Sequence, residues 1–311
     1  MAFVLRTSTA PMPFVYPENW PKPAYDFSKN PITLEGFGLG RRLFYDPILS
    51  KDSTISCQSC HLQATGFTHV DHALSHGIEG RIGTRNTMTL MNLAWNKAFM
   101  WDGGVNHLDV QPLAPITSHD EMDETLANVV QKINRLPRYR ARFCNAFGDS
   151  TVTGQRVLLA LSQFMLQLVS YNSKYDRYIR HDSTATFTVQ EQNGLKLFDG
   201  HCNSCHTAPL FTNRDFERSD QAIDPALNDM GRMKITQNLA DSLHFKVPTL
   251  RNIEFSRPYM HDGRFKNLRE VLNNHAVTDL SPDQKVDLMA FLLTLTDQSF
   301  LFNPLFSFPR E

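Results

Sequence analysis

Cys57-Gln58-Ser59-Cys60-His61 and Cys202-Asn203-Ser204-Cys205-His206 share the pattern Cys-x-x-Cys-His, which is typical of c-type haem attachment. The two thiols of such a stretch add to the haem vinyl groups, and the histidine that follows is placed to bind the iron from below. Cysteines three positions apart on one helical turn can reach two neighbouring vinyl groups. The two copies use four of the five cysteines of the chain, so the sequence predicts two covalently bound haems.

Two other kinds of site also use paired cysteines. A thioredoxin-like redox pair relies on the two thiols alone and does not need a histidine after each pair. A four-cysteine zinc site usually has its second pair much nearer to the first than these two pairs lie in the sequence. Haem attachment is therefore the favoured interpretation of both stretches.

The length and composition bound the class of protein. The chain has 311 residues, which suits two domains of ordinary size, and 41% of them are hydrophobic. Its formal net charge of −1 predicts no strong attraction to nucleic acid or to a membrane surface. No run of about 18 apolar residues is present, so we expect no membrane span.

The N-terminus, Met1 to Pro13, lacks the charged start and apolar run of a signal peptide. Covalent haem attachment nevertheless takes place outside the bacterial cytoplasm. We therefore expect that a leader has been removed, that Met1 was added by cloning, and that the protein is periplasmic.

The segments before the two motifs resemble each other. A helix is expected over 33–45, ended by Pro47, and a second helix follows the capping-box pattern of Thr188 and Glu191. Three residues of the first helix match three of the second at one constant offset of 154: Gly40, Leu43 and Phe44 match Gly194, Leu197 and Phe198. Each half is therefore expected to be a cytochrome c-like unit, in which the glycine lets a second helix cross closely.

The rest of the chain completes a mainly α prediction. Further helices are expected over 126–135, 155–171 and 281–296, with long loops over 66–121 and 207–245 and no convincing strands. Residues 1–30 are rich in proline and aromatic residues and are expected to lie extended over the surface. We expect two cytochrome c-like domains, 31–180 and 181–311, each binding one covalent haem.

A set of residues between and after the motifs now narrows the interpretation. The first group is Arg85-Asn86, Leu93, Met100-Trp101-Asp102-Gly103, Gln111, Pro115 and Glu121-Met122. The second group is Lys246-Val247-Pro248-Thr249-Leu250-Arg251-Asn252 and Pro258-Tyr259-Met260-His261-Asp262-Gly263. With the two haem motifs, these residues resemble the bacterial di-haem cytochrome c peroxidases and their relative MauG, the di-haem enzyme that matures methylamine dehydrogenase. The resemblance covers nearly all of the chain from about residue 32 to residue 300.

The resemblance implies a role for each matching residue around the N-terminal haem. His61 would be the proximal ligand of this haem, whose other face would open to hydrogen peroxide. Glu121 would be the acid–base group over that face, and it would move a proton from the near to the far peroxide oxygen. Gln111 would position the peroxide, and Pro115 would line the pocket and deny the iron a sixth protein ligand.

The resemblance also implies how the two haems communicate. His206 would hold the C-terminal haem, which receives electrons from a donor, and Trp101 would carry electrons between the haems. Asn86, together with backbone oxygens near Ser256 and Pro258, would hold a calcium ion where the domains meet.

The sixth ligand of the C-terminal haem departs from the family. The peroxidases usually have methionine there and MauG has tyrosine, whereas the aligned position in this chain is His275. We expect ligation by His206 and His275, with Met260, His261 and Met289 as the competing ligands. Because methionine raises a haem potential, its replacement by imidazole should lower the potential of this haem.

A histidine-bearing loop follows the first motif. In peroxidases that need reductive activation, a histidine of this loop caps the peroxide-binding haem in the oxidised state. His76 is the expected cap, and His69 and His72 are alternatives in the same loop. If His76 does bind the iron, the loop must leave before peroxide can react.

Three functions remain open on sequence grounds. The leading one is a peroxidase that reduces hydrogen peroxide to water with electrons from a small cytochrome c or a copper protein. The second is a MauG-like oxidase that uses peroxide to oxidise tryptophan or another side chain of a partner protein. The third is a di-haem electron-transfer cytochrome without catalytic activity. A homodimer is one oligomeric state that the resemblance allows.

Overall fold

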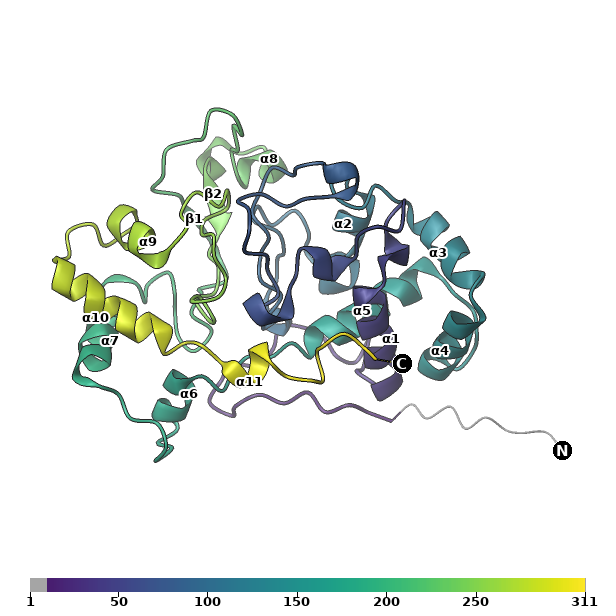
Figure 1. Ribbon diagram of the computed structural model, residues 1–311, viewed down its shortest axis with the longest axis horizontal. Helices are drawn as coiled ribbons and strands as arrows, with labels where there is room; N and C mark the ends of the chain where they lie inside the picture. The colour runs from purple at the N-terminus through teal and green to yellow at the C-terminus, as the bar shows by residue number, and fades with distance from the viewer. Residues whose placement is uncertain (1–9, 311) are drawn as a thin grey trace.

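The computed structural model describes residues 10–310, and Figure 1 shows a mostly helical molecule with one small sheet. The prediction of a mainly α fold is confirmed. The larger helices are α1 (Leu34–Tyr45), α3 (Leu126–Asn134), α4 (Pro137–Phe147), α5 (Gly154–Leu166), α7 (Val189–His201) and α10 (Pro282–Leu293). The shorter ones are α2 (Leu113–Thr117), α6 (Lys174–Ile179), α8 (Met233–Thr236), α9 (Leu268–Asn274) and α11 (Gln298–Leu301).

The helices that precede the two haem motifs begin at the predicted residues. The Thr33 side chain accepts a hydrogen bond from the backbone N–H of Gly36 and caps α1. Thr188 caps α7 through a complete capping box, in which Glu191 bonds back to the Thr188 N–H at 2.6 Å. Each helix therefore starts where side chains satisfy its first free N–H groups, and each ends close to a Cys-x-x-Cys-His stretch.

Each of these helices crosses a later helix at close range. Gly40 in α1 lies so near α5 that an added Cβ would be 1.8 Å from the Ala160 carbonyl oxygen. In α7, a Cβ added to Gly194 would be 2.0 Å from the Asp287 carbonyl oxygen of α10. The two matching glycines thus make equivalent helix crossings, α1 with α5 and α7 with α10, as the internal repeat predicted.

Two hydrophobic clusters surround these two crossings. The first is built around Phe44, Phe164 and Phe67, and the second around Phe198 and Phe291. Figure 1 shows α1 to α5 on one side of the molecule and α7, α9 and α10 on the other. Both clusters lie next to a haem motif, so each half buries its own apolar surface. The division into domains at residue 180 stays a prediction.

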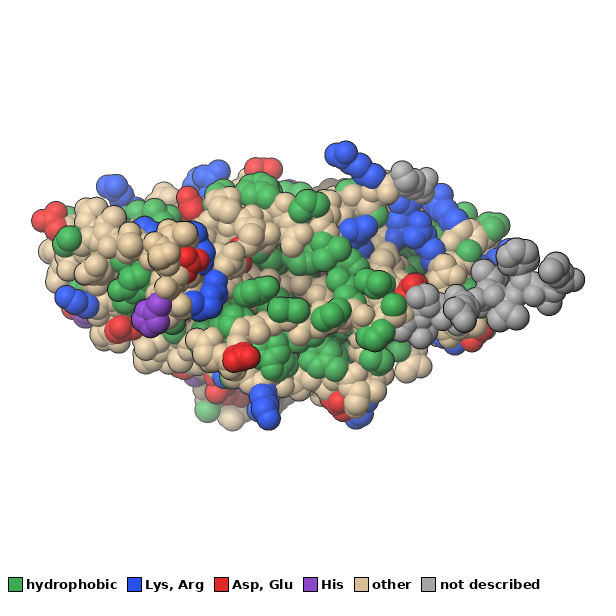
Figure 2. Space-filling view, turned by 90° about the horizontal axis from the view of Figure 1, so that it is seen from below, with side chains coloured by type: hydrophobic (Ala, Val, Ile, Leu, Met, Phe, Trp, Pro, Cys, Tyr) green, Lys and Arg blue, Asp and Glu red, His purple; other side chains and the backbone are tan. Residues whose placement is uncertain are grey.

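The chain ends tie the two sides together. After α10 the chain passes through α11 back to the first side, where the Tyr45 hydroxyl donates to the Phe306 carbonyl oxygen at 2.7 Å (Figure 1). The N-terminal segment has no helix over residues 10–30, as predicted, but it is anchored by Trp20, which is buried against Trp95. Residues 1–9 of this predicted extended segment lie outside the described residues. Apolar side chains gather across the middle of the face shown in Figure 2.

Several predictions about local structure were wrong. The expectation of no strands missed a two-stranded antiparallel sheet, β1 (Phe216–Arg218) with β2 (His244–Lys246), because strands of three residues leave no readable alternation. The helix expected over 155–171 ends at Leu166 in α5, and the helix expected over 281–296 ends at Leu293 in α10. Helix α4 was missed, although Pro137 at its start and Gly148 just past its end are typical helix signals.

The glycine crossings generate a stability prediction. Replacing Gly40 or Gly194 with alanine should lower the free energy of unfolding by about 1–3 kcal/mol, because the new methyl group meets backbone of the crossing helix. Gly38 in α1 and Gly200 in α7 are matched controls, since nothing lies within 4 Å of a Cβ added at either position. Alanine there should raise the free energy of unfolding by about 0.5–1 kcal/mol. Denaturant titration of the four variants would measure these changes, and equal effects within each helix would contradict the close crossing.

Candidate haem sites

The second motif borders a cavity of about 440 Å³. Residues from far apart in the sequence line it, among them many that the sequence singled out for the C-terminal haem and the junction. They are Asn86, Trp101, Cys202, Cys205, His206, Ser256, Pro258, Met260, His261 and His275. The volume falls in the range of ordinary cofactor and ligand sites.

His206 is held with one ring nitrogen bound to backbone. Its Nδ1 lies 3.2 Å from the Pro248 carbonyl oxygen and 3.4 Å from that of Phe211, so Nδ1 carries the proton and donates. Removal from water, together with the neighbouring His275, lowers the pKa of His206 to about 4. The ring is therefore neutral at physiological pH, and its Nε2 is the free ligand atom.

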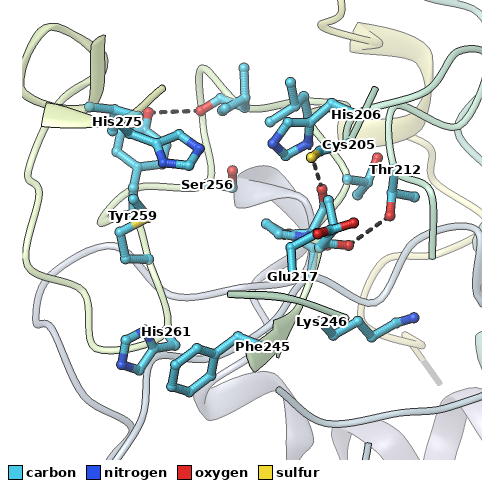
Figure 3. A pocket seen from close by; sticks show the side chains of 18 of the residues that line it. Cys205, His206, Thr212, Glu217, Phe245, Lys246, Ser256, Tyr259, His261 and His275 are labelled. Atoms are coloured by element: carbon cyan, nitrogen blue, oxygen red, sulfur yellow. Dashed lines mark hydrogen bonds between the residues drawn. The ribbon is translucent and has the colours of Figure 1, made fainter. Parts of the chain in front are cut away.

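His275 faces the same cavity from the end of α9. Figure 3 shows the rings of His206 and His275 pointing toward one another, with the Cys205 sulfur beside His206. The Nδ1 of His275 lies 2.9 Å from the Asp220 carboxylate, which leaves Nε2 for the cavity. The rings of His206 and His275 therefore line the same cavity, each with its Nδ1 engaged outside it.

The competing ligands are placed differently. His261 stacks on Phe245 with ring centroids 3.7 Å apart, at the end of the cavity away from His206 in Figure 3. Met260 also lines the cavity, whereas Met289 packs against the second hydrophobic cluster. His275, Met260 and His261 thus all line the cavity, and the choice of His275 as the sixth ligand stays a prediction.

The first motif repeats the arrangement around His206. Cys57 starts a short 3₁₀ turn, η2 (Cys57–Ser59), and His61 follows with its Nδ1 2.7 Å from the Phe67 carbonyl oxygen. Removal from water lowers the pKa of His61 to about 4, so this ring is also neutral with a free Nε2. The Cys60 thiol donates to the His76 carbonyl oxygen at 3.4 Å.

The cysteine environments argue against the two other kinds of site. Burial is the main cause that raises the pKa of Cys57 to about 12 and that of Cys202 to about 11, whereas a redox-active pair needs a thiol that ionises easily. Residues 10–310 contain no group of three or more histidine, cysteine or acidic side chains that could hold a metal ion. Two half-buried thiols followed by a histidine with a free Nε2 fit a covalently attached haem at each motif.

Glu121 lies close to the N-terminal motif. Its backbone carbonyl accepts from Ile78 N–H at 2.9 Å, next to the loop that carries His76. Burial and the charge of Asp120 raise the pKa of Glu121, and Glu121 in turn contributes to the raised pKa of Cys57 and of Cys60. The structure therefore brings a carboxyl group with a raised pKa to the thiols that would carry the N-terminal haem.

Close backbone packing fixes this arrangement. A Cβ added to Gly77 would lie 2.1 Å from the Asp120 carbonyl oxygen and 2.6 Å from the Glu121 Cα. On the other side, Met122 N–H donates to the Pro115 carbonyl oxygen at 3.2 Å, so Pro115 and Glu121 are brought together. Gln111 begins the same segment, and its side-chain amide donates to the Met100 sulfur at 3.6 Å.

The histidine-rich loop forms a stack that the sequence did not predict. The ring of His72 lies between those of His69 and His76, with centroid separations of 4.2 Å and 3.9 Å. Within the described chain, the buried Nε2 atoms of His69 and His72 have no hydrogen-bond partner. Buried imidazole nitrogens without partners fit a region that receives a polar or metal-containing group. The role of His76 as a cap of the iron stays a prediction.

Trp101 lies at the junction between the two sides. It is 9% exposed, lines the cavity at the second motif, and donates from Nε1 to the Asn86 carbonyl oxygen at 2.9 Å. Arg85, which the sequence marked only as part of the resemblance, holds this turn through Asp102 at 2.5 Å and reaches Asp229 at 2.6 Å. Through these two ion pairs, Arg85 links the turn that carries Trp101 to the C-terminal half.

The residues suggested for calcium also meet here. The side-chain amide of Asn86 donates to the Pro258 carbonyl oxygen at 3.2 Å, and Ser256 lines the adjoining cavity. Carbonyl and amide oxygens are ligands that calcium accepts. Here the amide nitrogen of Asn86 faces Pro258, so the calcium site stays a prediction that requires the amide to turn its oxygen into the site.

Comparisons with known proteins agree with this geometry. Residues 34–184 match the family model described as di-haem cytochrome c peroxidase. The chain is 34% identical to the methylamine utilization protein MauG of Methylorubrum extorquens, over 91% of this chain and 83% of that protein. It is 36% identical to the cytochrome c551 peroxidase of Nitrosomonas europaea, over 83% of this chain and 79% of that protein.

A solved structure extends the comparison. A MauG-like protein associated with microbial copper homeostasis aligns with a TM-score of 0.88 at 30% identity, over 96% of this chain and 99% of that chain. The di-haem peroxidase BthA of Burkholderia thailandensis aligns with a TM-score of 0.75 at 23% identity, which shows the shared fold. The family predicted from the sequence is confirmed.

Proposed function

Because the chain belongs to the di-haem cytochrome c peroxidase and MauG family, we propose that it is a haem peroxidase that reduces hydrogen peroxide to water. Two electrons and two protons convert one peroxide into two waters, and a small cytochrome c or copper protein supplies the electrons. The observation that carries this proposal is Glu121, a carboxyl group with a raised pKa beside the thiols of the N-terminal motif.

We further propose two covalent c-type haems, attached through Cys57 and Cys60 and through Cys202 and Cys205. The haem irons would supply the redox chemistry of peroxide reduction. The protein supplies the ligand geometry, since backbone carbonyls fix the Nδ1 atoms of His61 and His206 and leave both Nε2 atoms free. The cavity at the second motif and the unpartnered Nε2 atoms of His69 and His72 support this assignment.

Glu121 is proposed as the acid–base group. It would accept the proton from one peroxide oxygen and return it to the other, which makes water the leaving group. Its raised pKa suits this task, because a group that both accepts and donates works best with a pKa near the working pH. Gln111 would position the peroxide, and Pro115 would line the pocket without offering a ligand to the iron.

The C-terminal haem is proposed as the electron store, held by His206 and His275. Trp101 would carry electrons toward the N-terminal haem from its place at the junction. We also propose a periplasmic location and retain the homodimer as a prediction. Across residues 10–310, no helix combines the length and the apolar character that crossing a bilayer requires.

One observation favours a second candidate function. Ligation by His275 in place of methionine should lower the potential of the C-terminal haem, so that both haems can share oxidising equivalents. The similarity to MauG and to a MauG-like structure supports the same direction. The candidate is an oxidase that uses peroxide to oxidise a side chain, such as tryptophan, of a partner protein.

The role of Glu121 generates a pH prediction. The carboxylate form accepts the proton, so kcat/KM for peroxide should fall as the pH drops through the raised pKa, above the ordinary glutamate value of 4.5. Glu121→Gln should lower kcat/KM by about 10²–10⁴-fold and abolish this acidic limb. Asp120→Asn should shift the limb to lower pH, because it removes a like charge that raises the Glu121 pKa. Stopped-flow mixing with peroxide measures both effects. A wild-type rate for Glu121→Gln would remove Glu121 from the mechanism, and if the wild-type protein also reacts only slowly with peroxide, an electron-transfer cytochrome remains.

The two catalytic functions predict different products. With a reduced small c-type cytochrome and peroxide, the peroxidase should oxidise two donor molecules for each peroxide consumed. The oxidase should react slowly with that donor and should add oxygen to, or remove hydrogen from, a side chain of the partner protein. Donor absorbance and intact mass of the partner distinguish the outcomes. Fast stoichiometric donor oxidation would overturn the oxidase candidate.

The calcium proposal predicts a measurable site. Protein dialysed against a chelator should bind one calcium ion in a calorimetric titration. Asn86→Ala should bind it at least tenfold more weakly, because one of the few side-chain oxygens at the junction is lost. Asn96→Ala is a control from the same cavity wall that lies outside the proposed ligand set. Equal affinity in wild type and Asn86→Ala would contradict the site.

A further inference from the structure

The three imidazoles assigned to iron differ in what their Nδ1 atoms contact. His61 donates to the Phe67 carbonyl oxygen, and His206 donates to the Pro248 carbonyl oxygen. His275 instead donates to a carboxylate, that of Asp220, at 2.9 Å. A hydrogen bond to an ionised acceptor is roughly twice as strong as one between neutral groups. The carboxylate therefore sets His275 apart from the other two ligands.

Asp220 is itself held by groups on both sides. One carboxylate oxygen accepts from the Gln221 side-chain amide at 2.7 Å. The other accepts from the backbone N–H of Ala276 at 3.1 Å as well as from His275. The Gln221 amide also donates to the Asn274 carbonyl oxygen at 2.6 Å. The loop after β1 is thus joined to the end of α9 on both sides of His275.

We propose that Asp220 is the positioning residue of His275: it orients the ring, fixes its tautomer, and makes it a more basic ligand of the C-terminal haem iron. This inference rests on the proposed assignment of His275 as the sixth ligand. A carboxylate on the far nitrogen of a metal-bound imidazole fixes the ring orientation and raises ligand basicity. A more basic ligand stabilises the ferric state relative to the ferrous state, so Asp220 keeps the potential of this haem low.

The alternative is that Asp220 and His275 form an ordinary surface ion pair. Their side chains are 41% and 36% exposed, and exposed pairs contribute little to stability. Such a pair would not account for a ring whose free nitrogen faces His206 across the cavity (Figure 3). The contact with Asp220 instead sets the direction and the basicity of the His275 Nε2. The midpoint potential of the C-terminal haem can report that basicity.

The test measures the midpoint potentials of both haems in the intact di-haem protein by spectroelectrochemical titration. Asp220→Asn keeps the side-chain size but removes the charge, and it should weaken the preference for the ferric state at the C-terminal haem about tenfold. For a one-electron couple this corresponds to a rise of about 59 mV. The potential of the N-terminal haem should not change. Asp220→Glu should restore a value near that of the wild type.

Asp279→Asn is the matched control. It removes the same charge from an exposed position four residues after His275, so it reports any general electrostatic effect. A rise in Asp220→Asn that Asp279→Asn lacks supports the proposal. Equal potentials in wild type and Asp220→Asn, or equal shifts in the two variants, would overturn it. Covalent haem content of each variant shows that the compared proteins are fully loaded.

A further variant separates this inference from the assignment on which it rests. His275→Ala should convert the C-terminal haem from low-spin to high-spin in the absorption and paramagnetic resonance spectra. If His275→Ala leaves these spectra unchanged, the assignment of His275 fails, and the role of Asp220 fails with it. If His275→Ala has the expected effect but Asp220→Asn does not change the potential, only the role of Asp220 fails.

Discussion

The arrangement at both motifs depends on one kind of hydrogen bond, from the Nδ1 of the motif histidine to a backbone carbonyl. His61 makes it to Phe67 and His206 makes it to Phe211 and Pro248. The motif prepares the bond, because the N–H of each histidine also donates to the carbonyl of the first cysteine, at 2.9 and 2.8 Å. This turn brings the histidine ring close to the cysteines, as Figure 3 shows for His206 and the Cys205 sulfur. The hydrophobic clusters then pack against the first cysteine of each motif.

The two halves use the same scaffold around different groups. At each haem motif the glycine crossing, the capped helix and the histidine bond are equivalent. The surroundings differ, because Glu121, a carboxyl group with a raised pKa, lies near the first motif, whereas the imidazole of His275 lines the cavity at the second. An internal repeat therefore accounts for the elements that the halves share, and the proposed division between a peroxide-binding haem and an electron-storing haem rests on the residues that differ.

The sequence predicted those parts of the molecule that local chemistry controls. Thr33, Thr188 and the glycines of the repeat act within one turn or at one crossing, so their patterns were readable. The roles of Asp220 and Asp229 could not be predicted, because each lies in an irregular loop and its partner is more than 50 positions away in the sequence. The two strands were missed because each is only three residues long, and the histidine stack was missed because it lies in a loop without regular structure. His275 could be singled out only through the resemblance, and its partner only through the structure.

The junction between the halves shows why such long-range contacts matter. Arg85 is bound on one side by Asp102 and on the other by Asp229, whose pKa its charge holds well below the usual range despite the opposing effect of burial. The next residue, Asn86, receives the Trp101 indole N–H through its carbonyl oxygen and bonds to Pro258 through its side chain. Loss of the arginine would leave two partly buried carboxylates facing each other at the tryptophan turn. The same two residues therefore hold the halves together and fix the one aromatic ring proposed to carry electrons between them.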